Sequence, residues 1–360
     1  MKNGKISVGI TQGDVNGVGY EVILKIFAEP TMLELCTPIL YGSPKVATYH
    51  RKAMELTTNF VTIASADEAA DNKLNLVDCL PDEVKIDFGQ ATAEGGRAAL
   101  LALEKAMADY QAGKIDVLVT APINKAAIQG DQFHFPGHTE YIQHKLDGQG
   151  EALMILMNEG LRVALVTTHL PLREVAGAIT KEKVMGKLRI FHQSLRRDFS
   201  VSKPRIAVLA LNPHAGDGGL IGQEEQEVLV PAIKELEAEG IICYGPYPAD
   251  GFFGSRTYEH FDGVLAMYHD QGLAPFKTLA MEHGVNFTAG LPLVRTSPDH
   301  GTAYDIAGQG KADETSMRQA IYTAIDVYRN RLHYDEPLQN PLRKQYHEKH
   351  DDSDKLKLNA

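Results

Sequence analysis

The sequence predicts an α/β protein built on a mostly parallel β-sheet. Strand-like and helix-like segments alternate over nearly the whole chain. The strand-like segments are short runs of Val, Ile, Leu and Ala bounded by turn residues, which is typical of buried parallel strands. We expect strands near residues 5–10, 38–41, 59–63, 116–120, 205–211, 241–244, 263–267 and 285–288. We expect helices near 17–28, 44–55, 90–111, 181–198, 223–239 and 314–330.

One segment departs from this alternation. In residues 152–168, two apolar runs meet at Asn158-Glu159-Gly160, which is the pattern of an antiparallel hairpin. Such a hairpin inside a parallel α/β chain often builds a lobe boundary or a dimer arm. At the C-terminal end, residues 336–360 are expected to form a flexible tail, because the chain is polar and charge-rich from about Lys344 onward.

Composition and charge exclude several classes of protein. At 360 residues, with 44% hydrophobic and 23% charged side chains, the chain can bury a large core in one or two lobes. No apolar run reaches the roughly 18 residues that span a bilayer, and the N-terminus lacks signal-peptide features. Cys36, Cys79 and Cys243 are too scattered for a disulfide framework or a metal knuckle. The net charge of −11 disfavours nonspecific nucleic-acid binding. We therefore expect a cytoplasmic protein with neither a nucleic-acid nor a membrane partner.

Three histidines occupy corresponding points of the strand pattern. His169, His214 and His269 each follow an apolar run and precede a turn that contains Gly or Pro. In open α/β sheets, ligands bind beyond the carboxyl ends of the strands. A single histidine there is usually a core or loop residue, but three at the same point of the pattern favour a shared site. Three neutral imidazoles with one open coordination position are typical of a catalytic divalent metal.

An acidic chain needs a local group of cations to bind an anionic substrate. A segment rich in Gly and Pro contains Lys277, Asn286 and Arg295. Together with His138, these residues can form such a group. Arginine is suited to bidentate recognition of an oxyanion. Thr139 stands before a helix-like segment, where it either caps the helix or binds a phosphate.

Other features have both a functional and a structural interpretation. Residues 11–19, TQGDVNGVG, match neither GxGxxG nor GxxxxGK[ST], so a tight turn near a ligand explains them as well as a phosphate loop does. Asp250 and Asp270 are candidate general bases or orienting groups, although most aspartates are surface or capping residues. The absence of GxSxG and HExxH motifs disfavours a serine hydrolase and a zincin protease.

Several longer motifs carry a family resemblance. Residues 300–311, HGTAYDIAGQGK, resemble a nucleotide-pocket segment of isopropylmalate and isocitrate dehydrogenases. Five motifs resemble the 4-hydroxythreonine-4-phosphate dehydrogenase family, and they occur in the family's order: GHTEY (137–141), TTHLPL (167–172), LNPHAGDGG (211–219), AMYHDQGL (266–273) and GLPLVRTSPDHGTAYDIAG (290–308). Two positions depart from the family pattern. The chain has GDVNGVGYE (13–21) in place of GDPAGIGPE, and Gly251 follows Asp250 where the family has threonine.

The resemblance implies a two-lobed isocitrate/isopropylmalate dehydrogenase-like fold. In that fold residues 1–128 and 272–335 form a nucleotide-binding lobe, and residues 129–271 form a lobe for metal binding and dimerisation. It implies a homodimer with the active site at the subunit interface, and NAD or NADP bound near Ser297–Gly308. The implied ligands of one divalent ion, zinc, magnesium or cobalt, are His169, His214 and His269. The implied substrate contacts are His138, Thr139, Lys277, Asn286 and Arg295.

The expected reaction is the metal-dependent, NAD(P)-linked oxidation of 4-(phosphooxy)-L-threonine to 2-amino-3-oxo-4-(phosphooxy)butanoate. This β-keto acid decarboxylates to 3-amino-2-oxopropyl phosphate, a step of pyridoxal phosphate (vitamin B6) biosynthesis. The metal would lower the pKa of the substrate hydroxyl, and Asp250 or a neutral Lys277 would accept its proton. Two alternatives are a sibling dehydrogenase for a phosphorylated four-carbon sugar acid and a metal-dependent hydrolase. The nucleotide-pocket segment argues against the hydrolase.

Overall fold

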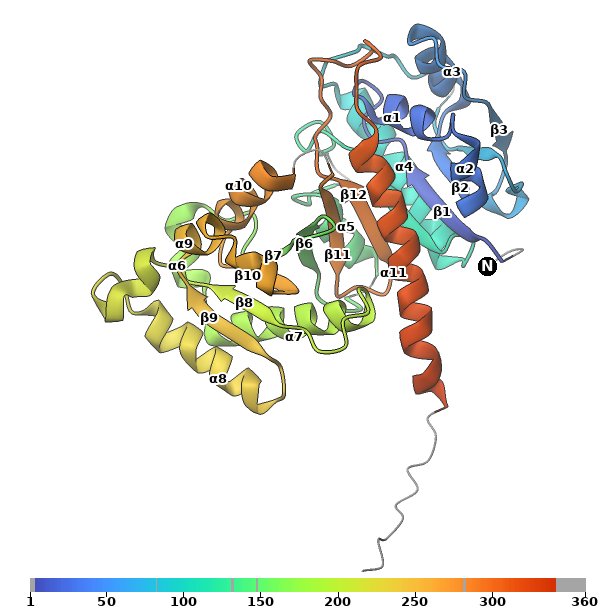
Figure 1. Ribbon diagram of the computed structural model, residues 1–360. Coiled ribbons are helices and arrows are strands. Elements are labelled where there is room, and N and C mark those ends of the chain that lie inside the picture. The colour runs from blue at the N-terminus through green and yellow to red at the C-terminus, as the bar shows by residue number, and fades with distance from the viewer. Residues whose placement is uncertain (1–3, 82, 131–132, 147, 281–282, 341–360) are drawn as a thin grey trace, which may run out of the picture.

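The computed structural model of the chain describes residues 4–81, 83–130, 133–146, 148–280 and 283–340. Within these residues, helices alternate with strands, and the strands form one 12-stranded sheet in the order β3-β4-β2-β1-β5-β12-β11-β6-β7-β10-β8-β9. Figure 1 shows the two ends of this sheet, each with its own helices. The predicted fold class, α/β with a mostly parallel sheet and an antiparallel hairpin, is confirmed. In the described ranges, no helix is long and apolar enough to cross a membrane.

The first six strands of the sheet order are parallel to one another. They are β3 (Phe60–Ile63), β4 (Leu74–Asp78), β2 (Cys36–Gly42), β1 (Ile6–Thr11), β5 (Val117–Thr120) and β12 (Val294–Pro298). Side chains alternate between two buried faces: Val117 and Val119 lie in one apolar cluster, and Leu118 lies in another. Burial on both faces explains why β1 and β5 are nearly continuous apolar runs rather than alternating ones.

The remaining strands contain the antiparallel part of the sheet. β11 (Val285–Ala289) is antiparallel to both β12 and β6 (Leu153–Met157), and β6 is antiparallel to β7 (Arg162–Leu165). The β6–β7 hairpin matches the expected one, and the Asn158 side chain accepts hydrogen bonds from the amides of Gly160 and Leu161 in its turn. β10 (Gly263–Ala266), β8 (Ile206–Leu209) and β9 (Cys243–Tyr247) then continue in parallel from β7.

Several helices begin where the sequence supplies a capping side chain. Ser43, Thr92 and Thr180 each accept a hydrogen bond from a first-turn amide of the helix that follows. The helices are α1 (Gly19–Ile26), α2 (Pro30–Leu35), α3 (Pro44–Ala53), α4 (Ala93–Gln111), α5 (His138–Lys145), α6 (Leu172–Ala178), α7 (Lys181–Arg197), α8 (Val230–Ala238), α9 (Ala249–Gly254), α10 (His269–Ala280) and α11 (Thr315–Gln339). The expected tail is helical as far as Gln339, and its residues 341–360 lie outside the described part of the chain.

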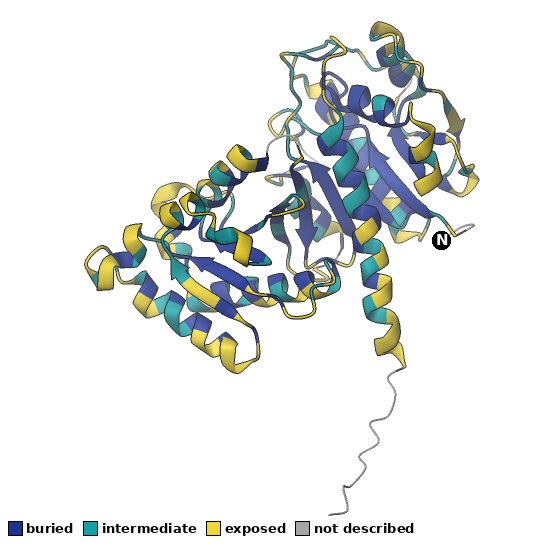
Figure 2. Ribbon diagram, in the orientation of Figure 1, coloured by how far each residue is buried: buried dark blue, intermediate teal, exposed yellow. Residues whose placement is uncertain are grey.

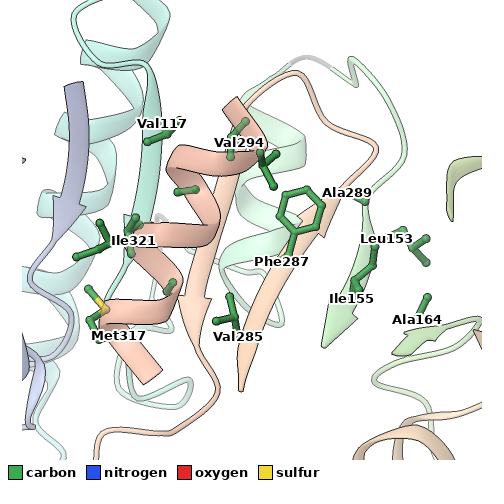
Figure 3. Close-up of a cluster of buried hydrophobic side chains, with 14 of the residues drawn as sticks. Val117, Leu153, Ile155, Ala164, Val285, Phe287, Ala289, Val294, Met317 and Ile321 are labelled. Atoms are coloured by element: carbon green, nitrogen blue, oxygen red, sulfur yellow. The ribbon is translucent and has the colours of Figure 1, made fainter. Parts of the chain in front are cut away.

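The core runs along the sheet beneath α11. Met317 and Ile321 of α11 lie against the strands near the junction of the two ends of the sheet, where β12 and β11 meet (Figure 3). Phe287, which is fully buried, fills the same cluster from β11. The strands are buried almost throughout, whereas exposed residues gather on the outer helices (Figure 2). Because α11 packs on β5, β12 and β11, it connects the two ends of the sheet.

One local expectation is wrong. The Gly- and Pro-bearing segment after His269 is not a turn but the helix α10, and Lys277 lies on this helix. A Cβ atom on Gly272 would lie 2.7 Å from Leu165 Cδ2, so this glycine is required by close packing of the helix against β7 rather than by a turn. Strands β4 and β12 were also missed, and β12 is the strand that carries Arg295.

Candidate active site

The sheet places all three candidate metal ligands at one edge. β7, β10 and β8 are adjacent and parallel, so their carboxyl ends point the same way. His169 follows β7, His269 begins α10 directly after β10, and His214 lies in the 3₁₀ segment Pro213–Gly219 after β8. The rings of His169 and His269 approach each other, with their centroids 6.2 Å apart.

The structure brings two of these three histidines together. In the described part of this single chain, no group of three or more His, Cys, Asp or Glu side chains is placed to hold a metal. His214 is exposed and has a left-handed backbone, with φ at 53°.

A carboxylate lies beside each of the two approaching rings. Asp270 Oδ1 is 2.7 Å from His269 Nδ1, and Glu140 Oε1 is 3.5 Å from His169 Nδ1. A carboxylate on one ring nitrogen fixes the ring and leaves the other nitrogen for a metal, so this donor set fits a divalent ion. Lys125 Nζ lies 3.3 Å from His169 Nε2, at the nitrogen that a metal would use.

A cavity of about 290 Å³ lies beside His169. Every residue predicted to contact the substrate lines this cavity, and these residues come from α5, α10, β11 and β12. Its lining includes His138, Thr139, Lys277, Asn286, Arg295, Ser297, Lys125, Glu140, Asp299 and His300. Residues far apart in the sequence thus meet in one small polar cavity.

Arg295 is the central cation of this cavity. Its side chain is buried, and its guanidinium donates to Thr120 Oγ1 from Nε at 3.2 Å and from Nη2 at 2.6 Å. A further contact, to Thr288 Oγ1, is 3.4 Å long. Arg295 forms no ion pair within 4.0 Å with a carboxylate among the described residues, and burial lowers its pKa to about 10 although the charge of Glu140 acts in the opposite direction. A buried cation that lacks a directly paired carboxylate favours the binding of an anion.

His138 shares this environment. Its Nδ1 lies 3.3 Å from Arg295 Nη2. Burial, and then the charges of Arg295 and Lys125, lower the pKa of His138 well below its usual value, so the ring is neutral at physiological pH. A neutral imidazole can accept from Arg295 at one nitrogen and donate to a ligand at the other.

The other predicted contacts supply one more cation and a neutral polar group. Lys277 Nζ lies 3.1 Å from Asp299 Oδ1, and burial raises the pKa of this aspartate even though Lys277 lowers it. Asn286 Oδ1 is buried and has no hydrogen-bond partner within the described ranges. Such an acceptor is satisfied by a hydrogen-bond donor on a ligand or by a water molecule.

Sequence reasoning missed Lys125, Glu140, Asp299 and His300 as cavity residues. Lys125 had an available signal, since it follows the expected strand 116–120 as the histidines follow theirs. Glu140 stands inside the GHTEY motif, directly after Thr139. Conversely, Asp250 does not line the cavity; it is an exposed residue of α9.

The segment Ser297–Gly308 contacts the glycine loop 11–19. Tyr304 donates to Asp14 Oδ2 at 2.6 Å, and the Val18 amide donates to the Thr302 carbonyl at 3.1 Å. A Cβ on Gly17 would lie 2.8 Å from that same carbonyl oxygen, so this glycine permits the close approach. The two loops, which the sequence offered as separate candidates for a nucleotide site, are therefore neighbours.

The parallel sheet, the carboxylate-oriented histidines at its edge and the cationic cavity beside them define an α/β enzyme with a site suited to a small anion. Comparison with known proteins then identifies the family. The profile of the pyridoxal phosphate biosynthetic protein PdxA matches residues 34–324. The chain is 66% identical to a 4-hydroxythreonine-4-phosphate dehydrogenase of Bacteroides thetaiotaomicron, covering 100% of this chain and 99% of the relative. The chain therefore belongs to the PdxA family, and it is an oxidoreductase of the dehydrogenase class.

Two further relatives agree with this assignment. The crystal structure of the 4-hydroxythreonine-4-phosphate dehydrogenase from Klebsiella pneumoniae superimposes with a TM-score of 0.79 at 34% identity, covering 91% of this chain and 99% of that one. A putative D-threonate 4-phosphate dehydrogenase of Oceanobacillus iheyensis is 39% identical, covering 89% of this chain and 97% of the relative. The resemblance inferred from the motifs is confirmed.

Proposed function

We propose that the protein oxidises 4-(phosphooxy)-L-threonine with NAD or NADP to 2-amino-3-oxo-4-(phosphooxy)butanoate. This product loses carbon dioxide to give 3-amino-2-oxopropyl phosphate for pyridoxal phosphate biosynthesis. The observation that supports the proposal most strongly is the buried Arg295, which has no carboxylate partner in the described chain and faces a small polar cavity. The names of the most similar relatives support the same substrate.

In this proposal, His138, Thr139, Lys277, Asn286 and Arg295 bind the polar ends of the substrate. The planar guanidinium of Arg295 is held by Thr120, which leaves its remaining donors to form paired hydrogen bonds to an oxyanion. Lys277 is already paired with Asp299, so we assign it to anion binding rather than to proton transfer. Asp250 lies away from the cavity, so a role for it as the base requires a partner subunit.

We further propose that His169, His214 and His269 hold a divalent ion, zinc, magnesium or cobalt, in a homodimer whose subunits share the site. The approach of His169 to His269 and the carboxylates on their Nδ1 atoms support this donor set. When bound, the ion would act as a Lewis acid on the hydroxyl and ketone oxygens of substrate and product. Asp270 and Glu140 keep the two rings oriented.

The nicotinamide cofactor is proposed to lie against Ser297–Gly308. Ser297 lines the cavity, so a cofactor bound along this segment can reach the substrate. Thr302 and Tyr304 of this segment contact the glycine loop, so that loop helps to hold the segment in place.

A sibling activity on a phosphorylated four-carbon sugar acid is the second candidate, favoured by the relative named for D-threonate 4-phosphate. Purified protein with divalent metal and NAD or NADP should reduce the cofactor when 4-(phosphooxy)-L-threonine is added, as followed by absorbance. Cofactor reduction with the threonate phosphate alone would replace the proposed substrate. Release of inorganic phosphate without cofactor reduction would indicate the hydrolase instead.

A further inference from the structure

We infer that Glu225 is the positioning residue of His214: its buried carboxylate holds the left-handed turn that presents this imidazole to the divalent ion. The inference rests on the proposed metal site and assigns a role to a residue outside the motifs that the sequence analysis singled out. It explains how an exposed segment keeps one unusual backbone conformation.

The backbone at His214 is left-handed over five consecutive residues. His214, Ala215 and Asp217 have φ values of 53°, 54° and 44°. Gly216 and Gly218, which alternate with them, have φ values of 76° and 65°. A left-handed backbone is unfavourable for a residue with a Cβ atom, and it persists only where surrounding contacts fix it. The turn therefore needs contacts from outside itself.

Glu225 supplies such contacts on the side that leads into the turn. It is 3% exposed and begins a π-helical turn, Glu225–Leu229, directly before α8. Its Oε1 accepts hydrogen bonds from the amides of Leu211 and Asn212, at 2.9 and 2.8 Å, and its Oε2 accepts one from Asn212 Nδ2 at 3.0 Å. Three donors thus fix the carboxylate against the two residues that precede the left-handed turn. π-Helical turns are rare and frequently occur at functional sites.

The same carboxylate lies beside the chain on the other side of His214. A Cβ atom on Gly216 would lie 2.6 Å from Glu225 Oε2, so the carboxylate fills the space next to this glycine. The Ile221 amide donates to the Gly216 carbonyl at 3.0 Å. The His214 side chain itself is exposed. Glu225 therefore sets the position of the imidazole through the backbone two residues before it and two residues after it.

A competing role for Glu225 is to stabilise the fold and do nothing else. The two roles differ in their dependence on His214. If Glu225 acts through His214, its loss weakens metal binding only while His214 is present. If it only stabilises the fold, its loss lowers the melting temperature and leaves the metal affinity of the folded protein unchanged.

The test measures the affinity of the metal-free, full-length protein for zinc and cobalt by calorimetry, and the visible spectrum of bound cobalt reports the ligand geometry. Glutamine at position 225 keeps only one acceptor atom for the three donors. We expect Glu225→Gln to lose about 10- to 100-fold in metal affinity, as is typical when a residue that orients a metal ligand is replaced. In a His214→Ala background, the same replacement should cause no further loss.

Two glycines of the turn test the same contact from the other side. Both have a positive φ, so alanine strains the backbone at either position. A Cβ atom on Gly216 would meet the Glu225 carboxylate, whereas no described atom lies within 4 Å of a Cβ atom on Gly218. We expect Gly216→Ala to weaken metal binding about 10-fold more than Gly218→Ala does. This pair decides the question even if Glu225→Gln does not fold.

Glu227→Gln is the matched control for the loss of one negative charge. Glu227 is an exposed residue of the same π-helical turn, so its replacement should leave metal affinity unchanged. Three results would overturn the inference: wild-type affinity in Glu225→Gln, an equal loss in Glu227→Gln, or equal losses in the two alanine variants. A further loss when Glu225→Gln is added to His214→Ala would also overturn it.

These measurements use neither substrate nor cofactor, so the inference can fail separately from the proposed reaction. A metal affinity that does not depend on His214 would contradict the proposed ligand set and the inference with it. Loss of affinity in His214→Ala together with wild-type affinity in Glu225→Gln would contradict the inference alone.

Discussion

Arg295→Lys tests whether the buried guanidinium is the anchor of the substrate phosphate. The replacement keeps one positive charge but turns a planar fork of five donors into a single ammonium. In the protein, two of the Arg295 nitrogens are used by Thr120 Oγ1, at 3.2 and 2.6 Å. A lysine at this position cannot bond to Thr120 and at the same time form the paired hydrogen bonds to an oxyanion that arginine forms.

The size of the effect follows from the burial of Arg295. Only 4% of the residue is exposed, and its pKa falls to about 10 because burial disfavours the charged form. That shift corresponds to about 3 kcal/mol of unfavourable desolvation, which a bound anion would offset. Loss of one or two charge-assisted hydrogen bonds, at about 1.5–3 kcal/mol each, should weaken substrate binding by about 100-fold.

The assay is the steady-state KM for the phosphorylated substrate, with its dissociation constant measured by calorimetry. Arg331→Lys is the matched control, because Arg331 is equally buried but pairs with Asp198 at 2.6 Å and donates to the carbonyl of Pro292. The control should lose stability and retain affinity. Equal affinity in Arg295→Lys and wild type, or equal losses in the two variants, would refute the assignment of Arg295 to the anion.

The remaining predictions concern the metal, the response to pH and the packing of helices. His169→Ala should abolish turnover and reduce the amount of bound divalent ion measured by atomic emission, with circular dichroism unchanged; full activity after exhaustive chelation would contradict a metal role. Burial lowers the pKa of His50 from 6.5 to about 4. Between these two pH values the unfolded state therefore binds a proton on His50 that the folded state does not bind. The free energy of unfolding should therefore fall by about 3 kcal/mol as the pH drops from 6.5 to about 4. His50→Gln should flatten this profile in urea titrations, and an unchanged slope would assign it to other groups. Gly96→Ala should destabilise the fold, because the new Cβ would lie 1.9 Å from the Ala127 carbonyl oxygen. Gly186→Ala in α7, where the space is open, should raise the free energy of unfolding by about 0.5–1 kcal/mol. Thermal melts that rank these two variants in the opposite order would refute the packing argument.

Local sequence patterns were sufficient for most of the secondary structure and for part of the site. Apolar runs located β1, β2, β5, β8 and β10, because a buried strand must be apolar whatever it pairs with. Helices were expected near 90–111 and 181–198, and the structure begins them at Ala93 and Lys181, directly after the capping residues Thr92 and Thr180. The rule that ligands bind at the carboxyl ends of parallel strands directed attention to His169 and His269, which the structure places side by side.

What the patterns could not determine is which strands become neighbours. Arg295 meets Thr120 only because β12 pairs with β5, across 175 residues of sequence, and no local pattern encodes that pairing. The same holds for Glu140, whose free carboxylate oxygen became evident only when α5 was packed beside His169. The sequence by itself determined which segments are strands and helices and which family the chain resembles, because these depend on short-range periodicity and motifs. Tertiary structure alone decided the contents and charge of the cavity, because burial and counterion distance arise from contacts between distant segments.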